Sequence, residues 1–189
     1  MAYLIGAIPF GLLFAKLLTG KDPREHGSGN IGATNAMRTG GKKVGAVTLL
    51  ADIFKGTIPV SIVIMLGADE LLIGAVALSA FLGHIFPVYL AFKGGKGVAT
   101  MFGVMIPWMP WVAIGTFIIW FVVFKLTRYV SIASVLAGIS LPLLTLALYV
   151  SWVNFGVCMV LGGIMILRHK GNIERLIAGV EPKTGSKND

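Results

Sequence analysis

The chain has 189 residues, of which 56% are hydrophobic and 13% are charged, and its mean hydropathy is +0.87. A soluble domain normally carries about 25% charged residues, and its core has no room for apolar runs that recur from one end of the chain to the other. The composition therefore excludes a soluble protein and predicts one polytopic membrane domain over residues 1–189.

Seven apolar segments alternate with short polar ones, which predicts an all-α integral membrane protein with seven transmembrane helices. In chain order they cover residues 2–18, 44–66, 71–92, 97–107, 110–125, 130–149 and 152–167. The first segment lacks the basic start and the small-residue cleavage site of a signal peptide, so we expect it to be a transmembrane helix.

The fourth segment, residues 97–107, is too short to cross a bilayer core about 30 Å thick at about 1.5 Å per residue. It is followed by Pro107-Trp108-Met109-Pro110-Trp111, and proline interrupts a helix, so we expect a break there, at an interface where Trp concentrates. A re-entrant hairpin over residues 97–125, with five or six spans in all, is the alternative.

The basic residues predict the orientation of the chain. Sixteen Lys and Arg against eight acidic residues give a formal net charge of +8. The basic residues lie in or beside four segments, residues 19–43, 93–96, 125–129 and 168–189. Because Lys and Arg are retained on the cytoplasmic side, the N-terminus is expected outside and the C-terminus inside. This placement beside apolar runs also argues against a nucleic-acid partner.

The first inner segment contains a glycine-rich stretch from His26 to Arg38. Gly27, Gly29 and Gly32 match the dinucleotide pattern GxGxxG, but apolar helices flank it in place of a βαβ unit, so we reject that interpretation. Glycines still let backbone N–H groups approach an anion. Further donors in this stretch are Ser28, Asn30 and Arg38, the last with a planar fork that suits phosphate. A capped turn that leads into an interfacial helix is the alternative.

The second inner segment combines Gly83-His84-Ile85-Phe86-Pro87 with Lys93-Gly94-Gly95-Lys96-Gly97. Its glycines free the backbone and its lysines supply point charges, as in a small phosphate cradle. The alternative is a flexible loop whose lysines only set the topology. His84 is expected about two turns inside the third span, either in a functional role or as a neutral side chain bonded to a neighbouring helix.

The third inner segment begins with Arg168-His169-Lys170. Its His169 and Asn172, three residues apart, are expected to share a helix face at the mouth of the last span. An amphipathic helix at the membrane surface is expected to follow. A basic flank that stops transfer is the alternative, but it leaves the His and Asn unexplained.

Two opposite charges, Asp52 and Lys55, lie three residues apart within the second span. They can pair with each other, or Lys55 can contribute to an anion site. Together the three inner segments are rich in donors and contain no cluster of ligands for a metal, so we expect one or two phosphate groups to bind there and no metal or other cofactor.

These motifs resemble those of a bacterial family, the acyl-phosphate-dependent glycerol-3-phosphate acyltransferases (PlsY). The resemblance covers nearly the whole chain and rests on three ordered motif segments, at about residues 19–43, 83–100 and 168–182. The matching stretches are Gly27 to Asn35 with Arg38, Gly83 to Pro87 with Lys93 to Thr100, and Arg168-His169 with Asn172-Ile173 and Gly179-Val180-Glu181-Pro182.

The resemblance implies transfer of a long fatty acyl group from acyl phosphate to the 1-hydroxyl of glycerol 3-phosphate. The products are lysophosphatidic acid and phosphate, and the reaction begins phospholipid synthesis. It also implies a seven-helix protein of the bacterial inner membrane, with a cytoplasmic active site and an acyl chain that lies between helices among membrane lipid.

The resemblance also assigns roles to residues. It implies that Lys96, His169 and Asn172 are catalytic. Residues implied to bind or position substrate phosphate are Ser28, Gly29, Asn30, Thr34, Asn35, Arg38, His84, Lys93, Gly94, Gly95, Lys96, Gly97 and Glu181. Lys55 is added to them because of its charge within a predicted span. Of these, Ser28, Arg38 and Lys96 would hold the phosphate of glycerol 3-phosphate, and Glu181 would support the C-terminal motif.

Two common acyl-transfer devices are absent from the sequence. No His is followed by Asp at the fifth position, and Ser28 lies outside a GxSxG elbow. An acyl phosphate already has a good leaving group, so orientation and charge neutralisation can supply most of the rate. We expect the donor's own phosphate, or else His169, to accept the hydroxyl proton. A donor linked to CoA or to a carrier protein, a transporter of a phosphorylated solute, and a structural membrane protein remain as alternatives.

Overall fold

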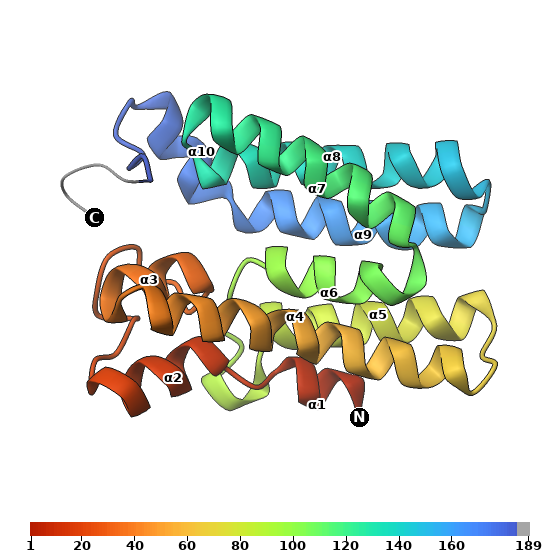
Figure 1. Cartoon of the computed structure of the whole chain (residues 1–189), viewed down its shortest axis with the longest axis horizontal. Coiled ribbons are helices and arrows are strands. Elements are labelled where there is room, and N and C mark those ends of the chain that lie inside the picture. The colour runs from red at the N-terminus through yellow and green to blue at the C-terminus, as the bar shows by residue number, and fades with distance from the viewer. Residues whose placement is uncertain (185–189) are drawn as a thin grey trace. The chain divides into compact units, whose positions relative to one another are not determined.

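The computed structural model describes residues 1–184, and these residues form helices and loops without a β-strand (Figure 1). The elements in chain order are α1 (Ala2–Gly6), α2 (Phe10–Thr19), α3 (Ala33–Gly40), α4 (Lys42–Met65), α5 (Glu70–Ile85), the 3-10 helix η1 (Val88–Leu90), α6 (Val98–Trp108), α7 (Pro110–Thr127), α8 (Val130–Tyr149), α9 (Trp152–Arg168) and α10 (Lys170–Ile177). The expected all-α class is confirmed.

Five segments in the described part of the chain are long and apolar enough to cross a membrane. They are Ala2–Thr19, Lys42–Met65, Glu70–Leu90, Pro110–Thr127 and Val130–Tyr149. A sixth is reached if α9 and α10, which meet at a bend of 52°, are counted as one span, and α6 is apolar but shorter.

The first span is not the continuous helix expected over residues 2–18, because it breaks at Pro9. The backbone of Pro9 has φ −88° and ψ 69°, and Phe10 N donates to Ile8 O at 3.1 Å. These values describe an inverse γ-turn. Proline has no N–H to continue the helical ladder, so α1 ends before it and α2 starts after it.

The third span also differs from the expectation, since α5 ends at Ile85 and not at residue 92. Pro87 follows two residues later, and the residue before a proline is driven out of the helical region. His84 therefore lies in the last turn of α5, six residues before the end of the apolar segment Glu70–Leu90. The segment that follows carries the second motif.

The expected break near Trp108 is confirmed. Met109 has φ −135° and ψ 72°, and α7 starts with Pro110 at its first turn, where a missing N–H costs nothing. Pro107 is accommodated inside α6.

Residues 1–108 form one compact unit, and the described residues from 109 to 184 form another. In the first unit, α4, α5 and α6 pack against one another and α1 packs against α5. Glycines permit the close approach: a Cβ on Gly6 would lie 2.0 Å from Ala80 O, and one on Gly103 would lie 2.1 Å from Ile53 O. Small residues bring membrane helices together in this way.

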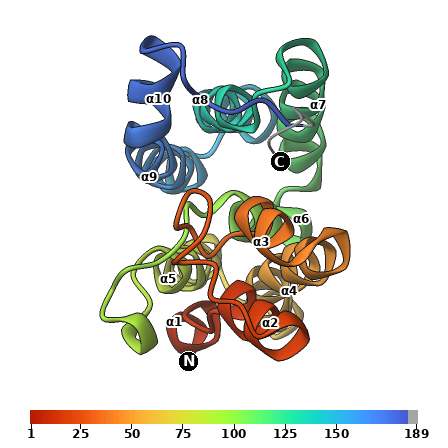
Figure 2. The ribbon, with the colours of Figure 1, turned by 90° about the vertical axis from the view of Figure 1, so that its left-hand side faces the viewer.

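In the second unit, α8 packs against both α7 and α9. Figure 2 looks along these helices and shows α8 between the other two, with α10 attached to the end of α9. The backbones of α8 and α9 approach closely at two glycines, since a Cβ on Gly162 would lie 2.3 Å from Gly138 O.

Candidate active site

The loop of the first motif is organised around the side chain of Asn35, which is 2% exposed. Asn35 Oδ1 accepts from Ser28 N at 2.9 Å, and its Nδ2 approaches three backbone carbonyls. Those carbonyls belong to Pro23, His26 and Asn30, at 2.7, 3.0 and 2.8 Å. One amide from the start of α3 thus holds the preceding loop in shape.

Three backbone N–H groups of this loop, those of Ser28, Gly29 and Gly32, bond within the loop itself, which differs from the expected anion cradle. Gly29 N donates to His26 O at 3.0 Å, and Gly32 N donates to Asn30 Oδ1 at 2.8 Å. Gly27 and Gly29 have positive φ angles of 57° and 68°, as this tight path requires. The glycines therefore determine the path of the loop, and the groups available to contact a ligand are mainly its side chains.

The side chains expected to bind in this motif occupy different places. Ser28 and Gly29 are exposed in the loop, Asn30 is half-buried, and Thr34 and Arg38 are half-buried on α3, with Arg38 in its last turn. Helix α3 packs on α4, where a Cβ on Gly45 would lie 2.5 Å from Met37 Cβ. The motif is thereby fixed to the second predicted span.

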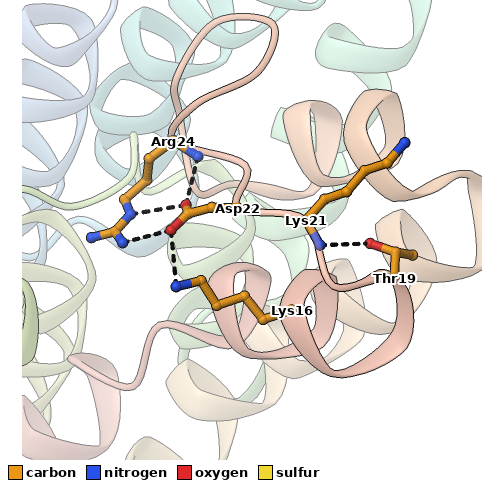
Figure 3. Close-up of polar contacts among 5 residues, drawn as sticks. All are labelled: Lys16, Thr19, Lys21, Asp22 and Arg24. Atoms are coloured by element: carbon orange, nitrogen blue, oxygen red, sulfur yellow. Dashed lines mark hydrogen bonds and ion pairs between the residues drawn. The ribbon is translucent and has the colours of Figure 1, made fainter.

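An ion-pair cluster anchors the start of this loop (Figure 3). The carboxylate of Asp22 accepts from Arg24 Nε at 2.9 Å and Arg24 Nη2 at 2.6 Å, and Lys16 Nζ lies 3.1 Å away. Asp22 is buried, which by itself would raise its pKa, but the hydrogen bond from Arg24, the largest effect, holds the pKa of the carboxyl well below its usual range. The cluster was not predicted from the sequence, although the opposite charges of Lys16, Asp22 and Arg24 lie within nine residues of one another.

The second motif packs its glycines on the end of α5. Gly95 N donates to His84 O at 3.1 Å, and a Cβ on Gly95 would lie 2.1 Å from His84 Nε2. A Cβ on Gly94 would lie 2.2 Å from His84 O. No larger residue fits at either position, so the loop depends on both glycines. Gly97 begins the turn into α6 with φ 87°.

The chain reverses direction just before this loop. Ala91 and Phe92 adopt φ angles of 48° and 64°, a left-handed conformation that costs a non-glycine residue of the order of 1 kcal/mol. Phe92 N donates to Pro87 O at 2.9 Å and helps hold the reversal. It leaves Lys93 exposed and Lys96 half-buried.

Beneath the second motif lies a buried cluster of Asp52, Lys55 and His84, which are 2%, 3% and 4% exposed. Lys55 Nζ lies 2.7 Å from Asp52 Oδ1, and His84 Nδ1 lies 3.7 Å from the same oxygen. The expected pairing of Asp52 with Lys55 is confirmed. Lys55 Nζ also donates to Ile8 O at 3.0 Å, so its ammonium points into the protein.

The third motif lies at the junction of α9 and α10. His169 is 2% exposed, and its Nδ1 is 2.8 Å from Met165 O, a carbonyl in the last turn of α9. A carbonyl only accepts, so Nδ1 carries the proton, and a neutral His169 keeps the lone pair on Nε2. Asn172 N donates to His169 O at 2.9 Å, which places the two residues one turn apart, as expected.

Glu181 returns to this junction from beyond α10. Its Oε1 accepts from Asn172 Nδ2 at 2.7 Å, and its Oε2 accepts from Arg175 Nε at 2.7 Å. Burial opposes ionisation of Glu181, but these hydrogen bonds and the Arg175 charge outweigh it and hold the pKa of the carboxyl below its usual range. Glu181 thus contacts Asn172, and its contact with Arg175 was not predicted from the sequence.

The C-terminal segment also contacts the turn between α7 and α8. Thr184 N donates to Arg128 O at 3.0 Å, and Lys183 Nζ lies 5.4 Å from the centre of the Tyr129 ring. These contacts hold the segment that carries Glu181 on the second unit.

An apolar groove of about 290 Å³ runs between α8 and α9. It is lined by Gly138, Ile139, Pro142, Leu143, Met159, Gly163 and Ile166. Met159, Gly163 and Ile166 share one face of α9, and the groove end at Ile166 is about one turn from His169. The groove therefore begins beside the polar junction and continues for about 10 Å along an apolar helix.

The expected site residues fall into two groups. The first and second motifs, with Ser28, Arg38, Lys93 and Lys96, lie in the unit of residues 1–108, and the third motif lies in the other unit. Within residues 1–184, no three His, Cys, Asp or Glu side chains are grouped to hold a metal ion.

Comparison with known proteins shows the family of this chain. A family model described as glycerol-3-phosphate acyltransferase matches residues 1–179. A glycerol-3-phosphate acyltransferase of Bartonella quintana is 45% identical over 191 residues, which cover 100% of this chain and 90% of that protein. One of Thioalkalivibrio sulfidiphilus is 41% identical over 98% of this chain and 92% of its own length.

Two solved structures are similar over 97% of this chain and 92% of theirs. Both are crystal structures of PlsY, described as an integral membrane glycerol 3-phosphate acyltransferase. The glycerol 3-phosphate form has a TM-score of 0.92 at 43% identity, and the lysophosphatidic acid form has a TM-score of 0.89 at 42% identity. The chain therefore belongs to the glycerol-3-phosphate acyltransferase family of integral membrane enzymes.

Proposed function

We propose that the protein transfers a fatty acyl group from acyl phosphate to the 1-hydroxyl of glycerol 3-phosphate. The products are lysophosphatidic acid and inorganic phosphate, and this is the first step of phospholipid synthesis. The observation that carries the proposal is the likeness, over 97% of the chain, to a structure in its glycerol 3-phosphate form. The donor is inferred from that family and from the absence of a nucleophile elbow in this sequence.

The phosphate of glycerol 3-phosphate is bound by Ser28, Arg38 and Lys96. Arg38 offers a planar fork of donors and Lys96 a point charge, a combination that suits a phosphate dianion. Lys93, exposed at the edge of the same loop, neutralises charge on the donor phosphate. Since the N–H groups of Ser28, Gly29 and Gly32 serve the loop itself, side chains carry the binding.

The remaining residues of the two loops shape the site. Gly94, Gly95 and Gly97 let the second loop pack on α5, and Asn35 and Asn30 hold the first loop. Thr34, beside them on α3, lines the approach to the bound phosphate. These residues act on the substrate through the positions of Ser28, Arg38 and Lys96.

In the reaction, the 1-hydroxyl oxygen attacks the acyl carbon, and the bond from that carbon to the phosphate oxygen breaks. The hydroxyl proton passes to the departing phosphate, which leaves as hydrogen phosphate. Lys96 offsets the charge that develops on the oxygens. Asn172 and Nε2 of His169 orient the substrates, and Glu181 holds Asn172 in place.

The acyl chain of the donor lies in the apolar groove between α8 and α9. The groove starts about one helical turn from His169 and is lined only by glycine, proline, aliphatic residues and methionine. Because the surrounding lipid is also apolar, the groove gains little from removing the acyl chain from water. It orients the acyl chain mainly through packing contacts.

The protein crosses the bacterial inner membrane seven times, with α6 as the short fourth span. Its N-terminus is outside, and its C-terminus and active site are cytoplasmic. The support is the placement of Lys and Arg in the segments that carry the motifs.

The experiment uses the purified full-length protein in lipid, with glycerol 3-phosphate and either palmitoyl phosphate or palmitoyl-CoA. Formation of lysophosphatidic acid and phosphate from palmitoyl phosphate alone supports the proposal. If product forms only from palmitoyl-CoA, the acyltransferase activity stands and acyl phosphate is not the donor. If a folded protein forms no product from either donor, the result favours a transporter. Lys96→Gln should abolish turnover, while the exposed Lys43→Gln in another inner segment should not.

A further inference from the structure

Buried charges within a membrane helix are costly and tend to mark functional positions. Asp52 and Lys55 lie on α4 inside a predicted span, and each is at most 3% exposed. An isolated i, i+3 ion pair would satisfy both charges by itself. Here the pair is joined to two further elements, so charge balance alone does not account for its contacts.

The first of these elements is the break between α1 and α2. The inverse γ-turn at Pro9 leaves the Ile8 carbonyl outside the helical ladder, and Lys55 Nζ donates to it at 3.0 Å. The same ammonium lies 5.8 Å from the centre of the Phe10 ring. Lys55 therefore contacts residues on both sides of the break.

The second element is the loop that carries Lys93 and Lys96. His84 Nδ1 faces Asp52 Oδ1 at 3.7 Å, while the other edge of the ring meets Gly95, whose Cβ would be 2.1 Å from Nε2. Gly95 N also donates to His84 O. The carboxylate thus lies beside one edge of the ring on which the glycine loop rests.

We propose that Asp52, Lys55 and His84 form a positioning network that fixes the position of the loop from Lys93 to Gly97 on the end of α5. The network acts without touching substrate. It replaces the direct phosphate-binding role that the sequence suggested for Lys55 and His84. The inference rests on the proposed function, because its effect is exerted through phosphate binding by Lys96.

The central test is the double variant Asp52→Asn/Lys55→Met, which removes both charges together and leaves neither one buried alone. Its melting temperature should stay close to that of the wild type. Its KM for glycerol 3-phosphate should rise about tenfold with a smaller change in kcat, since a displaced phosphate site loses orientation. Thr57→Val is the matched control: it removes a hydrogen bond from α4 to Gly103 O that does not reach the loop, and should leave KM unchanged.

A second pair of variants separates the ring's volume from its polar contact. His84→Asn keeps a donor near the position of Nδ1 and should retain most of the affinity. His84→Phe fills the space without that donor and should raise KM as the double variant does. Equal KM values for His84→Phe, the double variant and the wild type would show that the cluster only balances charge and would overturn the inference.

Binding is measured in parallel as the rise in melting temperature caused by glycerol 3-phosphate. His84→Phe should need about tenfold more glycerol 3-phosphate than the wild type for the same rise in melting temperature. If the wild type itself shows neither stabilisation nor turnover, the proposed function fails. If the wild type shows both and the variants match it, only the positioning network fails.

Discussion

Glu181 Oε1 accepts a hydrogen bond of 2.7 Å from Asn172 Nδ2, although Glu181 lies beyond the end of α10. Arg175 holds the second oxygen of the same carboxylate. The segment after α10 is thereby tied to a residue one turn from His169. The third motif is thus a closed polar structure and not a row of independent side chains.

Replacing Glu181 by Gln should loosen this structure. The variant loses the ion pair with Arg175, at a cost of about 1 kcal/mol for a partly solvated pair, and kcat should fall with it as Asn172 loses its fixed partner. Melting temperature and kcat of Glu181→Gln report the two effects. Glu174→Gln is the control, since its exposed side chain lies 4.0 Å from Lys170 Nζ. An unaltered kcat in Glu181→Gln would contradict the prediction.

Replacing Asn35 by Ala should disorder the first loop, because four backbone groups lose their partner at once. We expect kcat/KM for glycerol 3-phosphate to fall about a hundredfold as Ser28 loses its position. Limited proteolysis of residues 22–32 gives an independent measure of loop order. Thr39→Val, a nearly isosteric change at a buried position of α3, should alter neither. A normal protease pattern in Asn35→Ala would refute this account.

Replacing His169 by Ala tests the identity of the proton acceptor. If the donor phosphate accepts the proton, the variant should lose substrate affinity together with roughly ten- to hundredfold in kcat, since an orienting group is lost. Turnover and equilibrium binding of both substrates should be measured on the same preparation. Abolished turnover with both affinities intact would make His169 the base.

Replacing Gly163 by Leu should narrow the groove between α8 and α9 without disturbing packing, because no atom lies within 4 Å of a Cβ at this position. We expect the KM for palmitoyl phosphate to rise about three- to tenfold and that for a short-chain donor to change little, since only packing contacts are lost. Gly156→Leu is the matched control, two turns away on α9 and equally open but outside the groove. Equal effects of the two variants would exclude the groove as the acyl site.

Replacing Asp22 by Asn should lower stability more at neutral pH than in acid. The folded pKa of Asp22 lies below its unfolded value. Its contribution is therefore fully present above the unfolded pKa and is lost as the pH falls through the folded pKa. Loss of the charged hydrogen bonds should cost about 1–2 kcal/mol at pH 7. In melting curves from pH 7 to pH 3, the difference between the wild type and Asp22→Asn should stay constant down to about pH 4 and then begin to shrink, as the unfolded chain takes up a proton. A difference that stays constant down to about pH 3 would contradict the mechanism.

Much of the helical layout was predictable, because apolar runs bounded by polar loops leave few alternatives in a membrane. The break at Met109 followed from two prolines. The break at Pro9 followed from the same chemistry but was overlooked, since a single proline in an apolar run also occurs within intact helices, as Pro59 and Pro142 do here.

The interior of the site was less accessible to sequence reasoning. Asn35 was expected to bind substrate, yet its side-chain amide forms hydrogen bonds with the backbone of its own loop. Lys55 pairs with Asp52 as expected, but its bond to Ile8 O depends on the helix break. Such contacts join residues that are distant in sequence, so the spacing of residues along the chain does not predict them.

The close backbone contact between Gly138 and Gly162 has a consequence for how the enzyme can diversify. A side chain at Gly162 would force α8 and α9 apart, which would also shift the junction that carries His169. Changes of donor preference should therefore arise at Ile139, Leu143 or Met159, whose side chains line the groove and are largely exposed. The side chains at these three positions can change in size while α8 and α9 keep their spacing. The enzyme can therefore adapt to a different membrane composition without a change in the residues that carry out the reaction.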